Sequence, residues 1–334
     1  MKVKGKVWSQ RNCVKAVDGI SFDVYKGETL GIVGESGCGK STSGRAVVRL
    51  ERPTSGQILY KGEDIWRYSK EQLFQYRKKA QMIFQDAYST LDPRFTIGRS
   101  ICEPMVVHRM GTGDENEKRA RQLMRDVGLP EDYYGRYPHE FSGGQRQRIG
   151  VARALALNPE ILVCDEPVSA LDVSVQAQIL NLMKELQEKF GLTYIFISHN
   201  LSVVKHLCDR IGVIYLGNMV ELSEKGELFE NMLHPYTRAL ISAIPIPDPA
   251  FKREKVILEG DVPTPIDPPR GCPFATRCRY AAELCSDKRP ALEDVGEGHY
   301  VACHIYGSEK KEMAKQMEAK KILPPKRESL LKEV

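Results

Sequence analysis

The sequence lacks any uninterrupted apolar run of about 18 residues, the length that a membrane-crossing helix needs. Its N-terminus, Met1-Lys2-Val3-Lys4-Gly5-Lys6, is charged and does not lead into the apolar segment of a secretory signal. An excess of one charge is also lacking, because 49 Lys and Arg against 44 Asp and Glu leave a net charge of only +5. That excess is too small to indicate nucleic acid. We therefore expect a cytosolic protein that spans no membrane and binds no nucleic acid.

Closely spaced C-x-x-C pairs are absent, although the chain has nine cysteines. An odd number in a chain without a secretory signal argues against disulfides. Four cysteines lie together near the end: Cys272, Cys278, Cys285 and Cys303. Four thiolates can bind zinc or an iron–sulfur cluster, and the missing C-x-x-C knuckles favour the larger cluster. Zinc on the same cysteines, with or without His304, is one alternative, and buried free thiols are another.

The sequence does contain a glycine-rich segment with the spacing G-x-x-x-x-G-K-S. Its residues are Gly34, Glu35, Ser36, Gly37, Cys38, Gly39, Lys40 and Ser41. An apolar strand over Gly31–Val33 precedes it and a helix over Thr42–Leu50 follows, which is the context of a phosphate-binding loop. In such loops backbone N–H groups hold phosphate, the lysine reaches the β- and γ-phosphates and the serine binds Mg²⁺. We predict that residues 34–42 bind ATP and Mg²⁺; a glycine-rich turn without a ligand is the alternative.

Three further apolar stretches have the pattern of buried strands, and polar side chains follow each of them directly. These are Ala80–Phe84 with Gln85, Ile161–Cys164 with Asp165 and Glu166, and Thr193–Ile197 with Ser198 and His199. In open parallel sheets, ligands gather outside the carboxyl ends of the strands. We predict that Asp165 contacts Mg²⁺, that Gln85 contacts Mg²⁺ or the attacking water, that Glu166 polarises this water and that His199 contacts the γ-phosphate. A surface glutamine and a structural histidine are the alternatives.

Residues 92–159 have a helical pattern, including a helix over Glu117–Val127. Near the end of this segment lies the sequence Phe141-Ser142-Gly143-Gly144-Gln145. A helix over Arg146–Leu157 follows it. Ser142 and Gln145 have the spacing of a capping box, so an ordinary capped helix is one interpretation. Two glycines in a first helical turn, each costing about 1 kcal/mol relative to alanine, argue for close approach of a ligand to the backbone. We infer a second anion site formed by Ser142, Gly143, Gly144 and Gln145.

The remaining pattern is structural. Alternation over Val17–Val24 predicts a half-buried strand, and Pro53–Gly56 predicts a turn into an edge hairpin at Gln57–Tyr60. Apolar residues at helical spacing predict an amphipathic helix from Val175 to Phe190 that stops at Gly191. Prolines crowd residues 245–269, which indicates an extended linker.

In this order the motifs resemble those of an ABC-family ATPase over roughly residues 14–230. The matching parts are Gly34–Ser41 as Walker A, Gln85 as the Q-loop, Phe141–Gln145 as the signature, Ile161–Glu166 as Walker B, Ser169–Asp172 as the D-loop and His199 as the H-loop. The resemblance implies an α/β P-loop NTPase fold, with a RecA-like parallel sheet, an antiparallel β subdomain and a helical insertion. It also implies head-to-tail pairing, in which Ser142, Gly143 and Gly144 of one chain bind the nucleotide of the other. Asp172 of the D-loop is a further predicted nucleotide-binding residue.

Three segments narrow the resemblance to the ATP-binding subunits of oligopeptide and dipeptide importers, and to their F-type member. They are Phe84–Arg94, Tyr137–Arg148 and His234–Ile244. The resemblance implies two transmembrane permease subunits that dock at Asp86–Ile97, a paralogous ATPase subunit, an extracytoplasmic substrate-binding protein, and a place on the cytoplasmic face of the cell membrane. It also implies a [4Fe-4S] cluster on the four cysteines.

Several alternatives stay open beside that resemblance. The cargo could be an oligosaccharide or a nickel chelate, and the ATPase pair could be a homodimer. A soluble ABC ATPase acting on nucleic acid or ribosomes, and a regulatory metal-binding subunit without ATPase activity, are further alternatives. The chain also departs from the family pattern in two places. Its opening residues, Lys2–Trp8, resemble the segment that follows the family's first strand, so we expect that strand to be missing here. The adenine-stacking aromatic residue is expected just past that strand, and Trp8 is a candidate for its role. Asn200 replaces the usual acidic residue, and we expect little effect because His199 is kept.

The expected organisation has four parts. Residues 1–90 and 160–235 form the nucleotide-binding core, and residues 91–159 form the helical part with the signature. Residues 236–307 form a cysteine-rich extension, and residues 308–334 form a charged tail rich in lysine.

Overall fold

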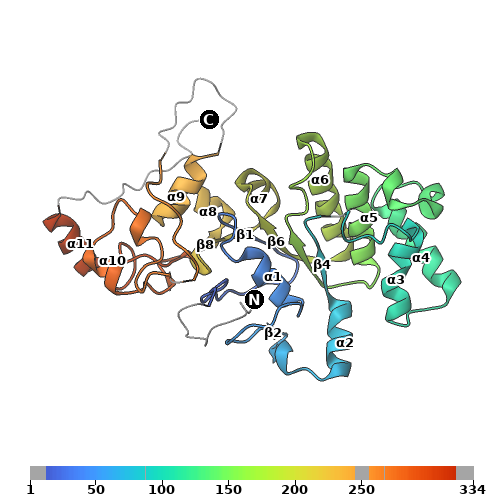
Figure 1. The fold of residues 1–334 in the computed structure, drawn as a ribbon, viewed down its shortest axis with the longest axis horizontal. Coiled ribbons are helices and arrows are strands. Elements are labelled where there is room, and N and C mark those ends of the chain that lie inside the picture. Colours follow the sequence, from blue (N-terminus) through green and yellow to red (C-terminus); the bar gives the residue numbers. More distant parts are fainter. Residues whose placement is uncertain (1–12, 87, 245–255, 267, 321–334) are drawn as a thin grey trace, which may run out of the picture.

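The structure is a computed structural model that describes residues 13–86, 88–244, 256–266 and 268–320. An eight-stranded sheet with the order β4-β5-β6-β1-β7-β8-β10-β9 runs through it, and β2 and β3 form a separate two-stranded sheet (Figure 1). The strands are β1 (Thr29–Val33), β2 (Leu59–Tyr60), β3 (Glu63–Asp64), β4 (Ala80–Ile83), β5 (Ile161–Asp165), β6 (Thr193–Ser198), β7 (Arg210–Tyr215), β8 (Asn218–Glu224), β9 (Glu293–Asp294) and β10 (Tyr300–Val301).

The five strands from β4 to β7 are parallel, so the carboxyl ends of all of them lie at one edge. Strands β1, β5 and β6 are apolar along nearly their whole length because helices cover both faces of the sheet. Successive residues face opposite layers: Leu162 and Phe196 pack into one hydrophobic cluster, and Val163 and Ile197 into the other. The strands predicted at these positions are confirmed.

Helices cover both faces of the sheet. Figure 1 shows α6 and α7 on one side and α1 on the other, while α3, α4 and α5 gather beyond the β4 edge. The helices are α1 (Lys40–Val47), α2 (Lys70–Lys79), α3 (Ile97–Val107), α4 (Gly113–Asp126), α5 (Gly143–Leu155), α6 (Val173–Phe190), α7 (Leu201–Leu207), α8 (Lys225–Glu230), α9 (Pro235–Ser242), α10 (Glu283–Asp287) and α11 (Lys310–Ala319). In the described part of the chain, none of the helices combines the length and the apolar character needed to cross a bilayer.

Helix boundaries differ from the prediction where capping residues set them. Helix α4 starts four residues earlier than expected, because the Thr112 side chain and Glu115 form a capping box. Helix α5 starts at Gly143 because Ser142 caps it, whereas apolar periodicity predicted a start at Arg146. Helix α6 ends at Phe190, as predicted, because Gly191 after it adopts a left-handed conformation with φ of 65°.

The strand predicted at Val17–Val24 is wrong. The alternation itself is present, since Ile20, Phe22 and Val24 pack against the core while the residues between them are exposed. Alternation reports which side chains are buried, whereas a strand also needs a hydrogen-bonded neighbour, and the described residues provide no ladder for this segment. The hairpin predicted after Pro53–Gly56 forms as β2 and β3. The predictions about Trp8 and a missing first strand lie outside the described residues.

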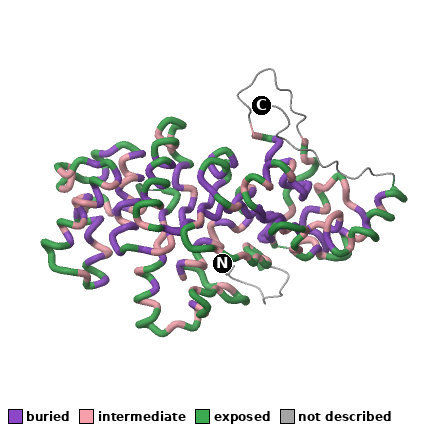
Figure 2. The backbone as a smooth tube through the Cα atoms, turned by 180° about the vertical axis from the view of Figure 1, so that it is seen from behind, coloured by how far each residue is buried: buried purple, intermediate pink, exposed green. Residues whose placement is uncertain are grey.

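The cysteine-rich extension is joined to the main sheet. Strand β10 pairs antiparallel with β8, with Tyr300 opposite Leu222, and β9 pairs with β10. Helix α11 packs on the same part through the buried side chains of Met313 and Met317. Figure 2 shows buried residues continuing from the central strands into the extension. The extension therefore continues the core of the main sheet.

Candidate nucleotide-binding and catalytic site

A cavity of about 460 Å³ lies where the phosphate-binding loop joins β1 to α1. Its lining is Ala16, Ser36, Gly37, Gly39, Lys40, Ser41, Thr42, Gln85, Glu166 and His199. Gly34, Glu35 and Cys38 of the predicted loop do not line it. Gly39 has φ of +100°, and a Cβ there would lie 2.1 Å from the carbonyl oxygen of Ala16, so the loop needs glycine at this turn.

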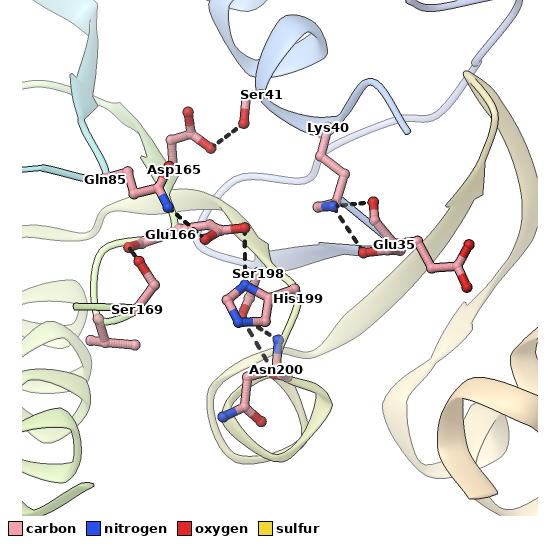
Figure 3. Close-up of polar contacts among 12 residues, drawn as sticks. Glu35, Lys40, Ser41, Gln85, Asp165, Glu166, Ser169, Ser198, His199 and Asn200 are labelled. Atoms are coloured by element: carbon pink, nitrogen blue, oxygen red, sulfur yellow. Dashed lines mark hydrogen bonds and ion pairs between the residues drawn. The ribbon is translucent and has the colours of Figure 1, made fainter. Parts of the chain in front are cut away.

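Lys40 is buried and points back along its own loop. Its Nζ donates to the carbonyl oxygens of Gly34 and Glu35, both at 2.8 Å (Figure 3). Cys38 lies 3.7 Å from the same nitrogen, and burial raises the pKa of its thiol although Lys40 acts against that. An ammonium group held by two neutral carbonyls keeps its positive charge available for a phosphate at the cavity wall.

Ser41 and Asp165 form the corner of the site that can bind a metal ion. The Ser41 hydroxyl donates to Asp165 Oδ1 at 2.7 Å, and Asp165 is almost fully buried at the end of β5. A hydroxyl and a carboxylate oxygen are ligands that Mg²⁺ accepts, usually with waters and phosphate oxygens completing its shell. The donor chemistry therefore fits Mg²⁺ at this corner.

Glu166 is at the centre of the polar network. Oε2 accepts a hydrogen bond from Gln85 Nε2 at 3.0 Å, and Oε1 lies 3.0 Å from His199 Nδ1 (Figure 3). Its backbone has φ of +48°, an uncommon conformation for glutamate. The Glu166 N–H donates to Ile197 on β6, and its carbonyl accepts from Ser169, which fixes this backbone. Such strain is concentrated at functional sites, and here it aims the carboxylate into the cavity.

Adjacent strands bring these residues together. Gln85, Glu166 and His199 follow β4, β5 and β6, and the loop follows β1, so the four ends are consecutive along the sheet. The arrangement offers a cationic side chain and a helix N-terminus for phosphates, and a carboxylate that can accept a proton from water. It can therefore bind a nucleoside triphosphate and activate water beside its terminal phosphate.

The signature residues lie elsewhere. Ser142 accepts a hydrogen bond from the Gln145 N–H at 3.3 Å, and the Gln145 side chain accepts from the Ser142 N–H at 3.0 Å. This is the predicted capping box, and neither residue lines the described cavity, nor do Gly143 and Gly144. Asp172 caps α6, and hydrogen bonds from Ser174 and from the Val175 N–H lower the pKa of its carboxyl.

The four cysteines near the C-terminus line one cavity of about 20 Å³, together with His234, Phe274 and His304. Burial raises the pKa of Cys272 to about 12 and that of Cys278 to about 11, and neighbouring thiols add to both shifts. Among the described residues, no three His, Cys, Asp or Glu side chains converge closely enough to hold one metal ion. The thiols are therefore neighbours, although they do not form a single-ion site.

Sequence reasoning missed two residues that contact the phosphate-binding loop. Tyr236 on α9 accepts a hydrogen bond from the Glu35 N–H at 2.8 Å, and Arg277 binds the Glu35 carboxylate at 2.9 Å. Both come from the C-terminal part of the chain. Tyr236 lies in the segment His234–Ile244 that carries the family resemblance, but nothing in that segment indicates a contact with the loop, and Arg277 lies in no recognised motif. The sequence carries no signal that relates residues separated by 242 positions.

A glycine-rich loop between a parallel strand and a helix, with a carboxylate pair at the end of β5, two strands away in the same sheet, is the arrangement of a P-loop ATPase. Family models agree: the one described as ABC transporter matches residues 17–169, and the one described as oligopeptide/dipeptide transporter, C-terminal region, matches residues 220–285. Two solved ABC cassettes are similar in fold. A dimeric cassette, MJ0796, bound to ADP and Pi, has a TM-score of 0.57 and 30% identity, covering 63% of this chain and 90% of its own. The cbiO1 protein of Clostridium perfringens has a TM-score of 0.59 and 28% identity, covering 64% and 84%.

Curated relatives are similar over nearly the whole chain. The oligopeptide transport ATP-binding protein AppF of Bacillus subtilis is 57% identical over 296 residues, which are 88% of this chain and 90% of the relative. The oligopeptide transport ATP-binding protein OppF of Haemophilus influenzae is 50% identical over 303 residues, or 90% and 91%. The chain belongs to the ABC transporter family, in its oligopeptide and dipeptide group of ATP-binding proteins.

Proposed function

We propose that this chain binds and hydrolyses ATP to drive the import of short peptides across the cell membrane. The observation that carries the proposal is the cavity at the sheet edge, where Lys40, Ser41, Gln85, Glu166 and His199 meet. The peptide cargo is supported by the names of relatives at 50–57% identity and by the match of the C-terminal family model. Cargo selection itself belongs to other subunits, because the cavity of this chain fits a nucleotide.

Each residue of the cavity has a proposed role in hydrolysis. Lys40 leaves its two carbonyl partners and binds the β- and γ-phosphates, and the loop N–H groups hold them in place. Glu166 accepts a proton from the attacking water, and its carboxylate is oriented by Gln85 and His199. His199 then contacts the γ-phosphate from the exposed side of the cavity.

Ser41, Asp165 and Gln85 are the proposed ligands that hold Mg²⁺. Bound there, Mg²⁺ neutralises charge on the β- and γ-phosphates. The buried Asp165 carboxylate has one oxygen occupied by the Ser41 hydroxyl, and the hydroxyl oxygen retains lone pairs for a cation. Ser41 lies in the first turn of α1, Asp165 at the end of β5 and Gln85 just after β4, so the proposed ligands come from the helix of the phosphate-binding loop and from two strand ends.

The proposed assembly pairs two ATP-binding chains head to tail. In the described chain the signature residues Ser142 to Gln145 do not line the cavity, and a second chain would bring its signature to it. The cassette MJ0796 was solved as a dimer, which supports this arrangement. The second ATP-binding chain is proposed to be a paralogue of this one. The pair is proposed to bind two transmembrane permeases on the cytoplasmic face of the membrane, through residues Asp86–Ile97. An extracytoplasmic substrate-binding protein is proposed to deliver the cargo on the other side.

The division of the chain follows these roles. Residues 1–90 and 160–235 are the proposed nucleotide-binding core, residues 91–159 carry the signature, and residues 236–307 are the extension. Helices α3 to α5 lie together beyond the β4 edge, which supports the second part. Because β10 pairs with β8, the boundary between the first and third parts crosses a continuous sheet.

A [4Fe-4S] cluster on Cys272, Cys278, Cys285 and Cys303 is proposed for the extension. Its support is the cavity that all four cysteines line. Each iron of such a cluster takes one thiolate, so the four sulfurs need not converge on one point, whereas zinc requires that they do. A cavity of about 20 Å³ holds little more than one water, so the thiols must move apart to admit the cluster. The cluster would cross-link the extension. Iron and acid-labile sulfide in anaerobically purified protein test this, and zinc in their place would refute it.

The function is tested by ATP turnover in the assembled membrane complex with its substrate-binding protein. Short peptides, an oligosaccharide and a nickel chelate are offered in turn. Stimulation by peptides alone supports both the coupled ATPase and the cargo. Stimulation by the sugar or the chelate keeps the transport mechanism and overturns the peptide cargo. Steady basal turnover that no cargo changes would overturn the transport role.

A further inference from the structure

Every polar group of Glu35 is engaged by a different neighbour. Its carbonyl oxygen accepts from Lys40 Nζ at 2.8 Å, and its N–H donates to Tyr236 Oη at 2.8 Å. Its carboxylate accepts from Arg277 Nη1, at 2.9 Å to Oε2 and 3.2 Å to Oε1. Figure 3 shows the carboxylate pointing away from Lys40. Glu35 thus connects the lysine of the phosphate-binding loop to two residues of the C-terminal part.

The Tyr236 hydroxyl is held in place by a buried aromatic cluster. The Tyr236 ring lies 4.7 Å from that of Tyr215 and 5.5 Å from that of Phe274, and all three side chains are almost fully buried. Tyr215 is the last residue of β7. Ile214, the residue before it, packs closely against the phosphate-binding loop, because a Cβ on Gly34 would lie 2.2 Å from the Ile214 carbonyl oxygen. Rotation of the hydroxyl away from Glu35 would require this cluster to repack.

Arg277 is similarly restrained. Its side chain is only 9% exposed, and Nη1 also lies 3.5 Å from Tyr215 Oη. The neighbouring residue is Cys278, one of the four cysteines, and Phe274 lines their cavity. The ion pair of Arg277 and Glu35 is stronger than an ion pair between exposed side chains, because most of the water around the guanidinium is excluded.

We infer that Arg277 and Tyr236 are positioning residues for the phosphate-binding loop, through which the C-terminal extension sets the affinity of the nucleotide site. This inference rests on the assignment of that site and is independent of the cargo. Glu35 does not line the nucleotide cavity, so the two residues act through it on Lys40. Because Glu35 is fixed, the loop is already ordered when Lys40 binds the phosphates, and ATP binding does not include the cost of ordering it. Without Arg277, ATP binding includes the entropy cost of ordering that segment.

The test compares ATP affinity in the full-length chain bearing Arg277→Gln with that in the wild type. We expect Kd for ATP to rise roughly tenfold, the equivalent of one lost charged hydrogen bond, while kcat at saturating ATP is nearly kept. Arg277→Lys should restore most of the affinity, because only one nitrogen of Arg277 binds the carboxylate. Tyr236→Phe removes only the hydroxyl and should weaken binding in the same direction.

Arg279→Gln is the matched control. Arg279 lies on the other side of Cys278 and is exposed, and its aromatic neighbour is Tyr280. The control should bind ATP like the wild type. Glu35→Gln combined with Arg277→Gln should be no weaker than either alone, since both break the same pair. Equal ATP affinity in the wild type and in Arg277→Gln, or a loss of kcat without loss of affinity, would refute the inference. Failure of the wild type to bind ATP would instead refute the nucleotide site.

Discussion

Glu166 and His199 face each other across the ends of β5 and β6, with Oε1 of the glutamate 3.0 Å from Nδ1 of the histidine. Gln85 holds the second carboxylate oxygen from the other side, at the end of β4. The carboxylate is therefore held between two strand ends by side chains of the chain itself. Its backbone keeps φ at +48°, which the hydrogen bond to Ile197 holds in place. A group oriented in this way costs little reorganisation when it accepts a proton.

Glu166→Gln should keep ATP binding and lower kcat by a factor on the order of 10² to 10⁴, because glutamine accepts no proton from water. The glutamine amide fits the same space, so the loop and Lys40 are undisturbed. Nucleotide affinity and single-turnover hydrolysis are measured side by side. Glu188→Gln, on the exposed face of α6, is the matched control and should behave like the wild type. Unchanged turnover in Glu166→Gln would show that another group is the base.

Asp165→Asn should raise the Mg²⁺ concentration needed for half-maximal hydrolysis by roughly tenfold or more, since one negative ligand is lost from the proposed Mg²⁺ site. The asparagine oxygen can still accept from the Ser41 hydroxyl, as Asp165 Oδ1 does at 2.7 Å. Mg²⁺ is titrated at fixed ATP, and metal-free nucleotide binding is measured separately. The same Mg²⁺ dependence in variant and wild type would exclude Asp165 from the metal shell.

The four strand ends of the site could be predicted from the sequence. Three of the strands are short apolar runs followed at once by a polar residue, the fourth leads into the glycine-rich loop, and parallel connections place such ends at one sheet edge. Helix starts were predicted less well, because Ser142 and Thr112 set them through side-chain caps that apolar periodicity does not register. The spacing of the signature singled out its residues, but the helix that they begin starts at Gly143, three residues before the start that the apolar pattern predicts.

The link between Glu35 and Arg277 could not be predicted in the same way. The two residues belong to segments with no shared motif, and their contact depends on how β8, α9 and the extension pack against β7. The joining of the extension to the main sheet was missed for a related reason. Strands β9 and β10 have two residues each, too few for alternation to show in the sequence.

Gly44→Ala should lower the free energy of unfolding by about 1–3 kcal/mol, because its Cβ would lie 2.7 Å from Ile197 and 2.9 Å from Val163. Helix α1 would have to move off the sheet, and Kd for ATP should rise since Ser41 lies on the same helix. Gly150→Ala is the contrasting variant on α5, where no atom lies within 4 Å of the added Cβ. It should stabilise the protein by about 1 kcal/mol. The free energies of unfolding of the two variants are measured by urea denaturation. The same change in both variants would contradict the close packing of α1 on the sheet.

His299 and Glu221 form a buried ionic contact that makes stability depend on pH. Glu221 is fully buried and accepts from the Leu233 and His234 N–H groups, and His299 Nε2 lies 2.8 Å from it. Burial lowers the pKa of His299, but hydrogen bonds to Glu221 and Glu227 and their charges outweigh it, so the pKa is raised above 6.5. The contact therefore stabilises the fold fully below pH 6.5, and that contribution is lost as the pH rises through the raised pKa.

His299→Gln should accordingly destabilise the protein most in acid. The free energy of unfolding is expected to fall by about 2 kcal/mol at about pH 6, because a buried charged hydrogen bond is lost. The deficit should shrink as the pH is raised, since the wild-type histidine becomes neutral there as well. Urea denaturation of both proteins across this range measures the difference, with His206→Gln on the exposed side of α7 as control. A deficit that grows with pH would mean that His299 is neutral in the folded protein.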